Sequence, residues 1–493
     1  MPDSPDTYLA FDLGAESGRA VLARINSGVI STDEVHRFAN QPVEYAGALH
    51  WDVLRLWWEF RTTLSRLAET HLNGIGVDAW GVDYALIGEH GELLQNPYHY
   101  RDKRTDGVME LVLATVGKDQ IYRETGIQFM QINTLYQLFA HRRDTPNLLR
   151  AARKLLTIPD LFHYWLTGNA VCEFTNATTT QMVNPQKHAW CRKLMDKLEL
   201  PSELLGEIVE PGTIVGKLSE NLSSSSALRG VPVIAPATHD TGSAVAGVVA
   251  RDGTAFLSSG TWSLLGTELD TPIINKEALQ LNFTNEGGVC GTTRLLKNVM
   301  GLWMLQCCRQ SWASQAQPCD YRELMELASR EREFAHLVDP DDKSFLHPDN
   351  MPDAIDRFCT KTQQEKPKSV GAYARTVLES LAFKYRQVIA DIERVTQRSI
   401  GQIRIIGGGS RNRLLNQFTA DATGCRVLAG PPEATALGNI AMQILATGAA
   451  SSLKEVREMI ERSFPTEVFE PRETDKWLRH ATRFQQYTEM VYA

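Results

Sequence analysis

The feature that most constrains this fold is a strand, a glycine-bearing turn and a second strand, which recur once in each half of the chain. In the first half, an apolar run at residues 8–11 leads into the polar turn 12–19 and then into a further apolar run. In the second half, apolar residues 255–257 lead into the small polar turn 258–261 and again into an apolar run. Each pattern predicts a β-hairpin. Because the two hairpins lie about half a chain apart, we expect a duplicated architecture with a boundary near residues 240–255.

Strands and helices alternate around the hairpins, which indicates an α/β protein. Apolar residues at helical spacing predict a helix that follows Asp52, a suitable N-cap, and a long helix over residues 377–395. A strand at 402–406 runs into three consecutive glycines, and helices and a short strand follow it. Alternating strands and helices pack as α/β layers. The interval 306–371 is polar and irregular, so we expect an insertion or a lobe-edge segment there.

Length, charge and composition narrow the class of protein. A chain of 493 residues with 43% hydrophobic content suits two large domains, which we predict at residues 1–248 and 249–493. A net charge of −8 without a basic block argues against a nucleic-acid partner. No apolar run approaches the about 18 residues of a membrane span, and no basic signal-peptide region is visible at the start. The eight cysteines form no CxxC pair, which predicts reduced thiols in a cytoplasmic protein.

Three glycine-bearing turns follow apolar strands, at residues 14–18, 258–261 and 407–409. Glycine lets the backbone approach a ligand closely, and consecutive turn N–H groups can bind an anion. Gly117-Lys118 and Gly216-Lys217 are not followed by the residues that complete a Walker A motif. A structural hairpin uses glycine as well. Three such turns in two related halves nevertheless indicate a nucleotide held between two lobes.

A strand over residues 233–235 is broken at Pro236 and followed by His239 and Asp240, which open a small-residue helix. An acid at the end of a strand and the start of a helix lies where α/β proteins place reactive groups. The helix N-terminus favours the ionised form of its carboxylate. On these residues alone, Asp240 fits a helix N-cap as well as a catalytic base. His239 alone is more typical of a hydrogen-bonded structural histidine than of a functional one.

The sequence resembles the FGGY carbohydrate kinases, members of the superfamily of actin, hexokinase and the heat-shock ATPases. Four segments carry the resemblance, which extends over nearly the whole chain: AFDLGAESGRA at 10–20, HDTGSAVAG at 239–247, LSSGTWSLLG at 257–266 and IIGGGSRNRLLNQ at 405–417. It implies an α/β fold of two ribonuclease-H-like (actin-like ATPase) lobes with a cleft between them. The first lobe would bind the sugar and carry the base, and the second would bind the nucleotide.

Other segments are similar to those of family members that phosphorylate L-rhamnulose at its 1-hydroxyl in L-rhamnose catabolism. They are VDAWGVDYALI at 77–87, YRDKRTDG at 100–107, GIQFMQINTLYQL at 126–138, TNATTTQMVN at 175–184, TNEGG at 284–288 and LKNVMGLW at 296–303. The resemblance implies ATP as co-substrate and Mg²⁺ as cofactor. A kinase for another ketose, such as L-fuculose or L-ribulose, remains an alternative. A nucleotide-switched binding protein is an alternative of another class, although a sugar-facing acid counts against it.

The resemblance also implies site residues. Asp240 is the base that accepts the proton of the sugar hydroxyl, and Asp12 helps to place the metal through water. The expected sugar contacts are Gly81, His239, Asp240, Thr241 and Asn298. The expected ATP contacts are Ala15, Glu16, Ser17, Gly18, Arg19, Thr261, Gln306, Gly408 and Asn412. Glu16 departs from the family, where a small residue is common, and its carboxylate would be costly beside phosphates unless it points outward.

Overall fold

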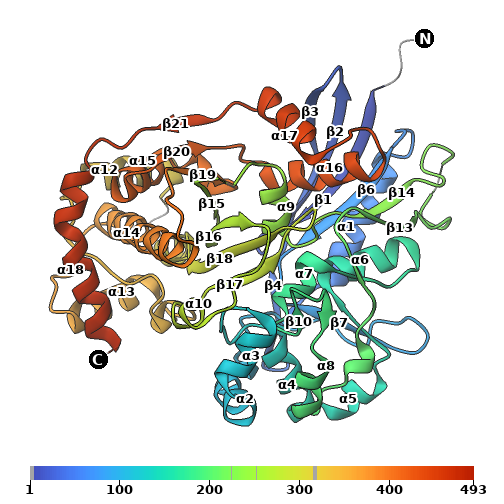
Figure 1. Ribbon diagram of the computed structural model, residues 1–493, viewed down its shortest axis with the longest axis horizontal. Helices are drawn as coiled ribbons and strands as arrows, with labels where there is room; N and C mark the ends of the chain where they lie inside the picture. Colours follow the sequence, from blue (N-terminus) through green and yellow to red (C-terminus); the bar gives the residue numbers. More distant parts are fainter. Residues whose placement is uncertain (1–4, 224, 251, 315–318, 493) are drawn as a thin grey trace. The chain divides into compact units, whose positions relative to one another are not determined.

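The computed structural model describes residues 5–223, 225–250, 252–314 and 319–492, which divide into two compact units (Figure 1). Unit 1 takes Met1–Val249, Glu268–Leu295 and Ala434–Phe464, and unit 2 takes Ala250–Thr267, Leu296–Glu433 and Pro465–Ala493. The first break between the units lies beside the predicted boundary at residues 248 and 249. Two later segments, 268–295 and 434–464, belong to unit 1 by their contacts, so both units are discontinuous in sequence.

A six-stranded sheet forms the centre of unit 1. Its order is β13 (Thr213–Lys217), β14 (Pro232–Ala235), β6 (Gly74–Ala79), β1 (Asp6–Leu13), β2 (Ser17–Asn26) and β3 (Val29–Ala39). Strands β1, β2 and β3 form an antiparallel meander, whereas β6 runs parallel to β1 and β14 runs parallel to β6. The outermost strand β13 is antiparallel to β14. The predicted first hairpin is therefore the β1–β2 pair.

The main sheet of unit 2 repeats this arrangement. Six strands follow in the order β18 (Thr293–Met300), β16 (Trp262–Leu269), β15 (Thr254–Ser259), β19 (Gln402–Ile406), β20 (Arg426–Ala429) and β21 (Glu467–Phe469). The strand β17 (Thr284–Gly287) falls in the segment 268–295, which belongs to unit 1. Strands β15 and β16 form the second predicted hairpin, and β19 and β20 continue in parallel from β15. The outermost strand is again antiparallel to its neighbour. The duplication predicted from two short hairpins is confirmed at the level of whole sheets.

Strand β1 is buried on both faces, because helices cover each side of the sheet. Tyr8 and Ala10 belong to an apolar cluster with α16 (Ala434–Ala446) and α17 (Leu453–Ser463). Phe11 points to the opposite face, since successive strand residues alternate, and its ring stacks at 3.8 Å on Phe60 of α1 (Val53–Arg66). Phe60 in turn stacks on Phe162 of α6 (Ile158–Thr167). Figure 1 shows α16 and α17 beside strands that precede them by hundreds of residues.

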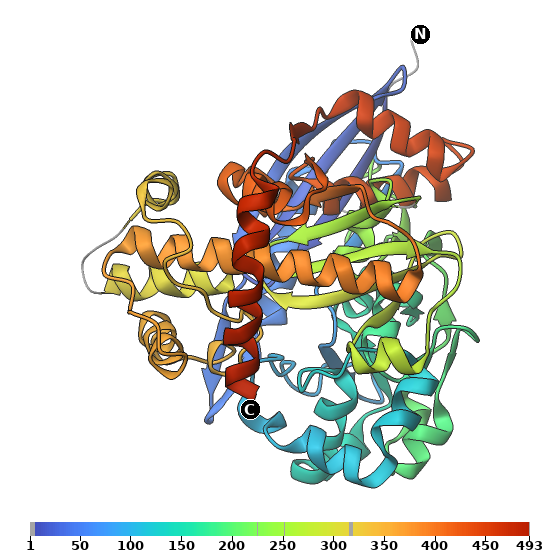
Figure 2. The same cartoon turned by 60° about the vertical axis from the view of Figure 1, so that its left-hand side comes forward.

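Helices of unit 2 lie within the segment that we expected to be irregular. They are α11 (Trp303–Ser314), α12 (Tyr321–Arg330) and α13 (Met351–Lys361), and they accompany α14 (Val370–Thr396), α15 (Arg413–Thr423) and α18 (Thr474–Tyr492) (Figure 2). The expectation of an irregular interval was wrong. On α12, for example, only Leu324 and Ala328 are buried. Because the exposed faces of such helices are polar or charged, the average composition of the interval 306–371 does not reveal their buried positions.

The remaining elements are mostly short. They are β4 (Pro42–Tyr45), β5 (Ala48–Trp51), β7 (Tyr84–Ile87), α2 (Val108–Val116), α3 (Lys118–Thr125), α4 (Thr134–Asp144), α5 (Pro146–Ala151), β8 (Lys154–Thr157), β9 (Cys172–Glu173), α7 (Phe174–Thr179), β10 (Val183–Asn184), β11 (Ala189–Trp190), α8 (Arg192–Lys197), β12 (Ile208–Val209), α9 (Asp240–Ala246) and α10 (Lys276–Gln280). Within the part of the chain that the structure describes, no helix is both long and apolar enough to cross a membrane.

Two glycines allow α16 to approach its neighbours closely. A Cβ atom on Gly438 would lie 1.6 Å from the backbone oxygen of Ser243 in α9. A Cβ atom on Gly76 of β6 would lie 2.2 Å from Oδ1 of Asn439. Neither position accommodates a side chain without movement of the backbone or of a buried amide. The glycines therefore fix how α9, which begins at Asp240, sits on β6 and α16.

We expect Gly438→Ala to destabilise unit 1 by about 3 kcal/mol, because the new methyl group overpacks against a backbone carbonyl that cannot move alone. Urea denaturation followed by tryptophan fluorescence measures the loss. Gly206→Ala is the matched control, since its added Cβ would meet its nearest neighbour, Sγ of Cys172, at an ordinary 3.5 Å. Equal midpoints for the two variants would contradict this account of the α9–α16 contact.

Candidate functional site

The turn between β1 and β2 is held in shape by one buried side chain from the end of β3. The N–H of Gly14 donates to the carbonyl of Ser17 at 3.0 Å. The Asn40 side chain donates to the Gly14 carbonyl at 2.8 Å, and the Asn40 backbone N–H donates to the Glu16 carbonyl at 3.0 Å. The Glu16 residue is exposed to solvent, which is the condition under which we expected its carboxylate to be tolerated. The ATP contacts assigned to residues 15–19 remain predictions.

Carboxylates gather at the carboxyl ends of β1 and β6. Asp12 and Asp78 are partners in the parallel register of these strands. Asp12 accepts two hydrogen bonds from the Arg19 guanidinium, at 2.9 and 2.6 Å. Asp78 is completely buried, and its Oδ2 accepts a hydrogen bond from the Asn439 amide at 2.6 Å. Burial, and next the nearby Asp12 charge, raise the pKa of Asp78 well above its usual range.

Asp240 is the first residue of α9, and the N-cap position belongs to His239. Its Oδ1 accepts hydrogen bonds from the backbone N–H and the hydroxyl of Thr241, at 2.5 and 3.2 Å. The side chain is 32% exposed, so it faces solvent on one side. Burial raises the pKa of Asp240, with Asp12 adding to the rise and the His239 ring opposing it. Of the two readings left open by the sequence, the structure excludes the N-cap.

A buried ion-pair network surrounds His239. Nε2 of the ring lies 3.4 Å from Oδ1 of Asp240, and Nδ1 lies 3.2 Å from Oε2 of Glu286. Arg294 reaches the same Glu286 oxygen at 3.2 Å, lies 3.3 Å from Nδ1 of the ring, and donates to the carbonyl of Gly287 at 2.8 Å. Burial alone would raise the pKa of Glu286, but His239 and Arg294 outweigh it and lower that pKa. Glu286 is therefore an ionised carboxylate held between a histidine and an arginine.

A second buried acid fixes the segment that leads to His239. Glu173 caps α7 by accepting from the backbone N–H groups of Thr175 and Asn176. The same side chain accepts from the backbone N–H and the hydroxyl of Thr238, at 3.0 and 2.6 Å. Burial raises the pKa of Glu173 to about 7. The TNATTT segment, which begins at Thr175, is thus tied to the residue that precedes His239.

The turn that holds Gly81 is organised by Asp83, which is fully buried. Oδ2 of Asp83 accepts from the indole N–H groups of Trp51 and Trp80, at 2.6 and 3.0 Å, and Oδ1 accepts from the amide of Gln137 at 2.8 Å. The N–H of Ala79 donates to the Thr238 carbonyl at 2.9 Å, which places the start of this turn beside the His239 segment. The AWGVDY motif therefore supplies a rigid backbone next to Asp240.

In unit 2, the turn between β15 and β16 is joined to the segment that starts α11. The Thr261 carbonyl accepts from the N–H groups of Gly301 and Trp303, each at 3.2 Å. Gln306 follows in the first turns of α11, and Asn298 lies half-buried on β18. The structure brings Thr261, Gln306 and Asn298 onto adjoining elements of one unit. Their assigned contacts with ATP and sugar remain predictions.

The glycine triplet packs against the same hairpin. Gly407 has φ +80°, and a Cβ atom on Gly409 would lie 2.0 Å from Oγ of Ser259. By contrast, apart from its chain neighbours, no heavy atom of the described residues lies within 4 Å of a Cβ built on Gly408, so this glycine faces open space. Asn412 caps α15 through the N–H of Leu415, and its amide donates to the Tyr321 hydroxyl at 2.8 Å. Gly408 thus has room for a ligand, whereas Asn412 already has structural partners.

Several polar residues of the site were missed from the sequence. Asp78 lies within the segment VDAWGVDY and Glu286 within TNEGG. Both segments were used for the family resemblance, but neither residue was assigned a role. Arg294 and Asn439 gave no signal, because Arg294 lies 55 residues from His239 and Asn439 lies 361 residues from Asp78. A reading of strand register would have found Asp78, since it pairs with Asp12 across parallel strands.

The carboxylates suit a magnesium ion that arrives with ATP. Among the described ranges, no group of three or more His, Cys, Asp or Glu side chains is arranged to hold a metal by itself. Mg²⁺ commonly takes one or two carboxylates and completes its shell with water and substrate phosphates. Asp12 and Asp78 offer two neighbouring carboxylates, and Oδ1 of Asp78 is buried without a hydrogen-bond partner in the described structure. The carboxylates of Asp12 and Asp78 therefore fit a magnesium ion.

The sequence matches the N-terminal domain of the FGGY family of carbohydrate kinases over residues 7–247 and the C-terminal domain of that family over residues 255–447. The chain belongs to this family. It is therefore a carbohydrate kinase, which transfers phosphate to a sugar hydroxyl, and the predicted enzyme class is confirmed. A binding protein of the actin or chaperone type, which remained an alternative from the sequence, is not supported.

Curated relatives refine this placement. A rhamnulokinase of Bacteroides thetaiotaomicron is 43% identical over 95% of this chain and 97% of its own. A rhamnulokinase of Pectobacterium atrosepticum is 44% identical over 97% of this chain and 95% of its own. Xylulose kinase from Lactobacillus acidophilus superposes with a TM-score of 0.82 at 16% identity, over 99% of each chain. Glycerol kinase from Plasmodium falciparum superposes with a TM-score of 0.78 at 14% identity, over 99% of this chain and 98% of its own. The predicted fold of two ribonuclease-H-like lobes is confirmed.

We expect Glu286→Gln to destabilise the protein by about 3 kcal/mol at pH 7, because it leaves the Arg294 cation buried without its countercharge. The pKa of Glu286 is lowered in the folded state, so its contribution is present above the unfolded value of 4.5 and lost as pH falls through the folded value. The difference between wild type and variant should therefore shrink below about pH 4.5. Denaturant unfolding measured across pH, with the exposed Glu203→Gln as control, tests this. A penalty that is independent of pH would contradict it.

Proposed function

We propose that this chain transfers the γ-phosphate of ATP to the 1-hydroxyl of L-rhamnulose. The observation that carries the proposal is Asp240, a partly exposed carboxylate of raised pKa at the start of α9, in a chain 40–44% identical to rhamnulokinases. The quoted AWGVDY and LKNVMGLW segments support L-rhamnulose over other ketoses. An ATP-dependent reaction and a cysteine spacing without a CxxC pair favour a cytoplasmic location.

Asp240 acts as general base in this proposal. Phosphoryl transfer to an alcohol requires a group that takes up the hydroxyl proton while the oxygen attacks phosphorus. A carboxylate becomes a better proton acceptor as its pKa rises toward the working pH. The raised pKa of Asp240 and its partial exposure serve that role. The neighbouring Thr241 N–H donates to the same Oδ1 and keeps the carboxylate oriented.

His239 and Glu286 orient the base. Glu286 lies against Nδ1 of the ring, and the ring presents Nε2 to Asp240 at 3.4 Å. Arg294 forms an ion pair with Glu286 at 3.2 Å. The contact of His239 with a sugar hydroxyl that the family resemblance implies would be made through Nε2, the ring nitrogen beside Asp240. Replacing this network would therefore alter the alignment of the sugar and of Asp240 together.

The phosphates would meet the β1–β2 turn and the glycine turns of unit 2. Magnesium supplies charge neutralisation of the transferring phosphoryl group when it is bound with ATP. Asp12 and Asp78 would hold it, directly or through water. Arg19 already pairs with Asp12 and so fixes the position of that carboxylate. Thr261, Gln306, Gly408 and Asn412 are the nucleotide contacts that the proposal assigns to unit 2.

Replacement of Asp240 by Asn should abolish phosphorylation and preserve ATP binding, because Asn keeps the size of the side chain but cannot accept the proton. We expect kcat to fall by about 10²-fold or more. A coupled assay for ADP measures turnover, and calorimetric titration with ATP measures binding. Asp119→Asn is the matched control, since Asp119 is an exposed first-turn acid of α3. A variant that kept more than about a tenth of wild-type turnover would refute the assignment of the base.

Sugar preference should follow hydroxyl stereochemistry more strongly than the substituent at carbon 6. A pocket distinguishes one methyl group by about 1–3 kcal/mol, whereas groups built to pair particular hydroxyls reject a wrong arrangement far more strongly. The measurement is kcat/KM for L-rhamnulose, L-fuculose, L-ribulose, D-xylulose and glycerol. We expect L-rhamnulose to rank first. If D-xylulose or glycerol ranked above it, the enzyme would remain a carbohydrate kinase but the proposed substrate would be wrong.

A further inference from the structure

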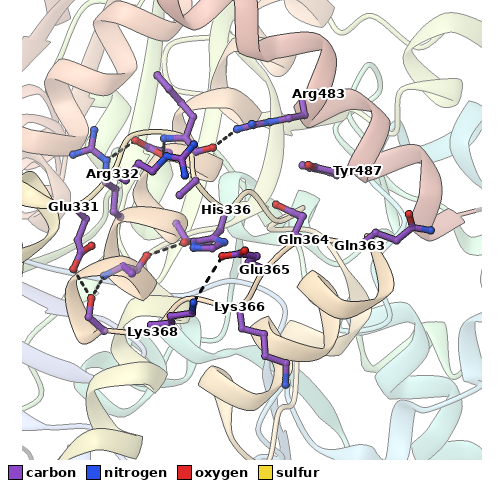
Figure 3. A pocket seen from close by; sticks show the side chains of 17 residues that line it. Glu331, Arg332, His336, Gln363, Gln364, Glu365, Lys366, Lys368, Arg483 and Tyr487 are labelled. Carbon is purple, nitrogen blue, oxygen red and sulfur yellow. Dashed lines mark hydrogen bonds and ion pairs between the residues drawn. The ribbon is translucent and has the colours of Figure 1, made fainter.

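A cavity of about 490 Å³ lies within unit 2 (Figure 3), and none of its lining residues is predicted to contact sugar, ATP or metal. Its wall is formed by residues 331–336, residues 363–369, the first turns of α14 and the helix α18. Sites for small molecules commonly enclose about 300–1,000 Å³. The cavity therefore has room for a metabolite, and nothing in the kinase reaction uses it.

The acidic side chains of the wall already have partners. Glu379 accepts from the guanidinium of Arg375 at 2.6 Å and from the backbone N–H of Phe334 at 2.8 Å. Glu331 accepts a short hydrogen bond from the hydroxyl of Ser369. Glu365 lies 3.9 Å from the ammonium group of Lys368. The negative charge of the wall is therefore compensated locally.

Two guanidinium groups of the wall have no carboxylate partner among the residues that the structure describes. Arg332 is exposed and has no hydrogen-bond or ion-pair partner among the residues that the structure describes. Arg483 donates to the backbone carbonyl of Phe334, and its Nε is buried without a partner in the described ranges. Nδ1 of His336 is likewise buried and unpartnered there. Burial lowers the pKa of His336, the neighbouring Glu365 opposes that change, and Arg332 and Arg483 reinforce it. Arg332, His336 and Arg483 all line the cavity.

We propose that this cavity binds a small phosphate monoester. Such a ligand carries a charge of about −1.5 to −2 at pH 7 and three acceptor oxygens, which matches two guanidinium groups that have no carboxylate partner in the described residues. Guanidinium groups bind phosphate oxygens in pairs through parallel N–H donors. The imidazole of His336 offers a further polar contact. Phe334, Ala372 and Tyr487, which also line the cavity, supply surface for the carbon skeleton of the ligand.

The position of the cavity separates it from the predicted ATP contacts within the same unit. Tyr321, at the first residue of α12, pairs with Asn412, whereas Glu331 follows the last residue of that helix and lines the cavity. A helix of 10 residues spans about 15 Å. A ligand in the cavity is therefore distinct from the phosphates of bound ATP.

The test is calorimetric titration of the full-length protein with glucose 6-phosphate, in the presence of a saturating non-hydrolysable ATP analogue. We expect one binding event per chain that survives the analogue. Arg332→Ala and Arg483→Ala should each weaken it at least about tenfold, because each loses charge-assisted hydrogen bonds to the phosphate. Arg330→Ala, which removes an exposed charge outside the cavity, is the matched control and should bind as wild type.

Other outcomes overturn the proposal. Complete loss of binding in the presence of the analogue would place the ligand in the ATP site. Unchanged affinity in Arg332→Ala would refute the site even if Arg483→Ala failed to fold, since Arg332 has no described partner to lose. If citrate bound more tightly than glucose 6-phosphate, the cavity would be a carboxylate site. If inorganic phosphate bound as tightly as glucose 6-phosphate, the apolar wall would contribute nothing to binding. Absence of binding by all of these probes would also refute it.

Discussion

The burial of charged side chains at the carboxyl ends of β1, β6 and β14 is the constraint on which the rest of unit 1 depends. Asp78 is completely buried, and Arg294 and Glu173 are as well. A buried charge without a partner is costly, so each requires a donor or a countercharge. Asn439 donates to Asp78, Arg294 pairs with Glu286, and Thr238 donates to Glu173. The discontinuous make-up of unit 1 follows from this requirement, because Glu286, Arg294 and Asn439 lie in its two returning segments.

The same constraint links stability to the chemistry of a carbohydrate kinase. A carboxylate of raised pKa is a better base, and the burial that raises the pKa of Asp240 also raises the free energy of its ionised form. The packing of α9 against α16, where Gly438 lies against Ser243, helps to stabilise Asp240 in this position. Glu173 and Asp83 hold the adjoining turns through several hydrogen bonds each. The base is therefore placed by residues that take no part in the reaction.

Unit 2 has the same order of strands as unit 1, but its turns carry the predicted nucleotide contacts. Its hairpin and its glycine triplet pack together at Ser259, and Gly408 is left facing open space. Its long helix α14 contacts this hairpin through the pair of Tyr385 and Ser263, at 2.6 Å. The first turns of the same helix line the cavity next to Arg332 and Arg483. One helix thus borders both the predicted nucleotide residues and the proposed anion site.

The duplicated α/β architecture, the two hairpins and the family could be predicted from the sequence alone, because strand periodicity and turn glycines are local in the chain. The sequence also pointed to Asp240, since a strand, a break and a helix start occupy neighbouring residues. The folded chain was needed to show that His239, and not Asp240, is the N-cap, and that Asp78, Glu286 and Arg294 belong to the site. The helices between residues 306 and 371 were hidden for a related reason, since their buried stripes pack on partners elsewhere. Hydrogen bonds and ion pairs between residues distant in sequence depend on how strands pair and helices pack, and a single sequence carries no local pattern for them.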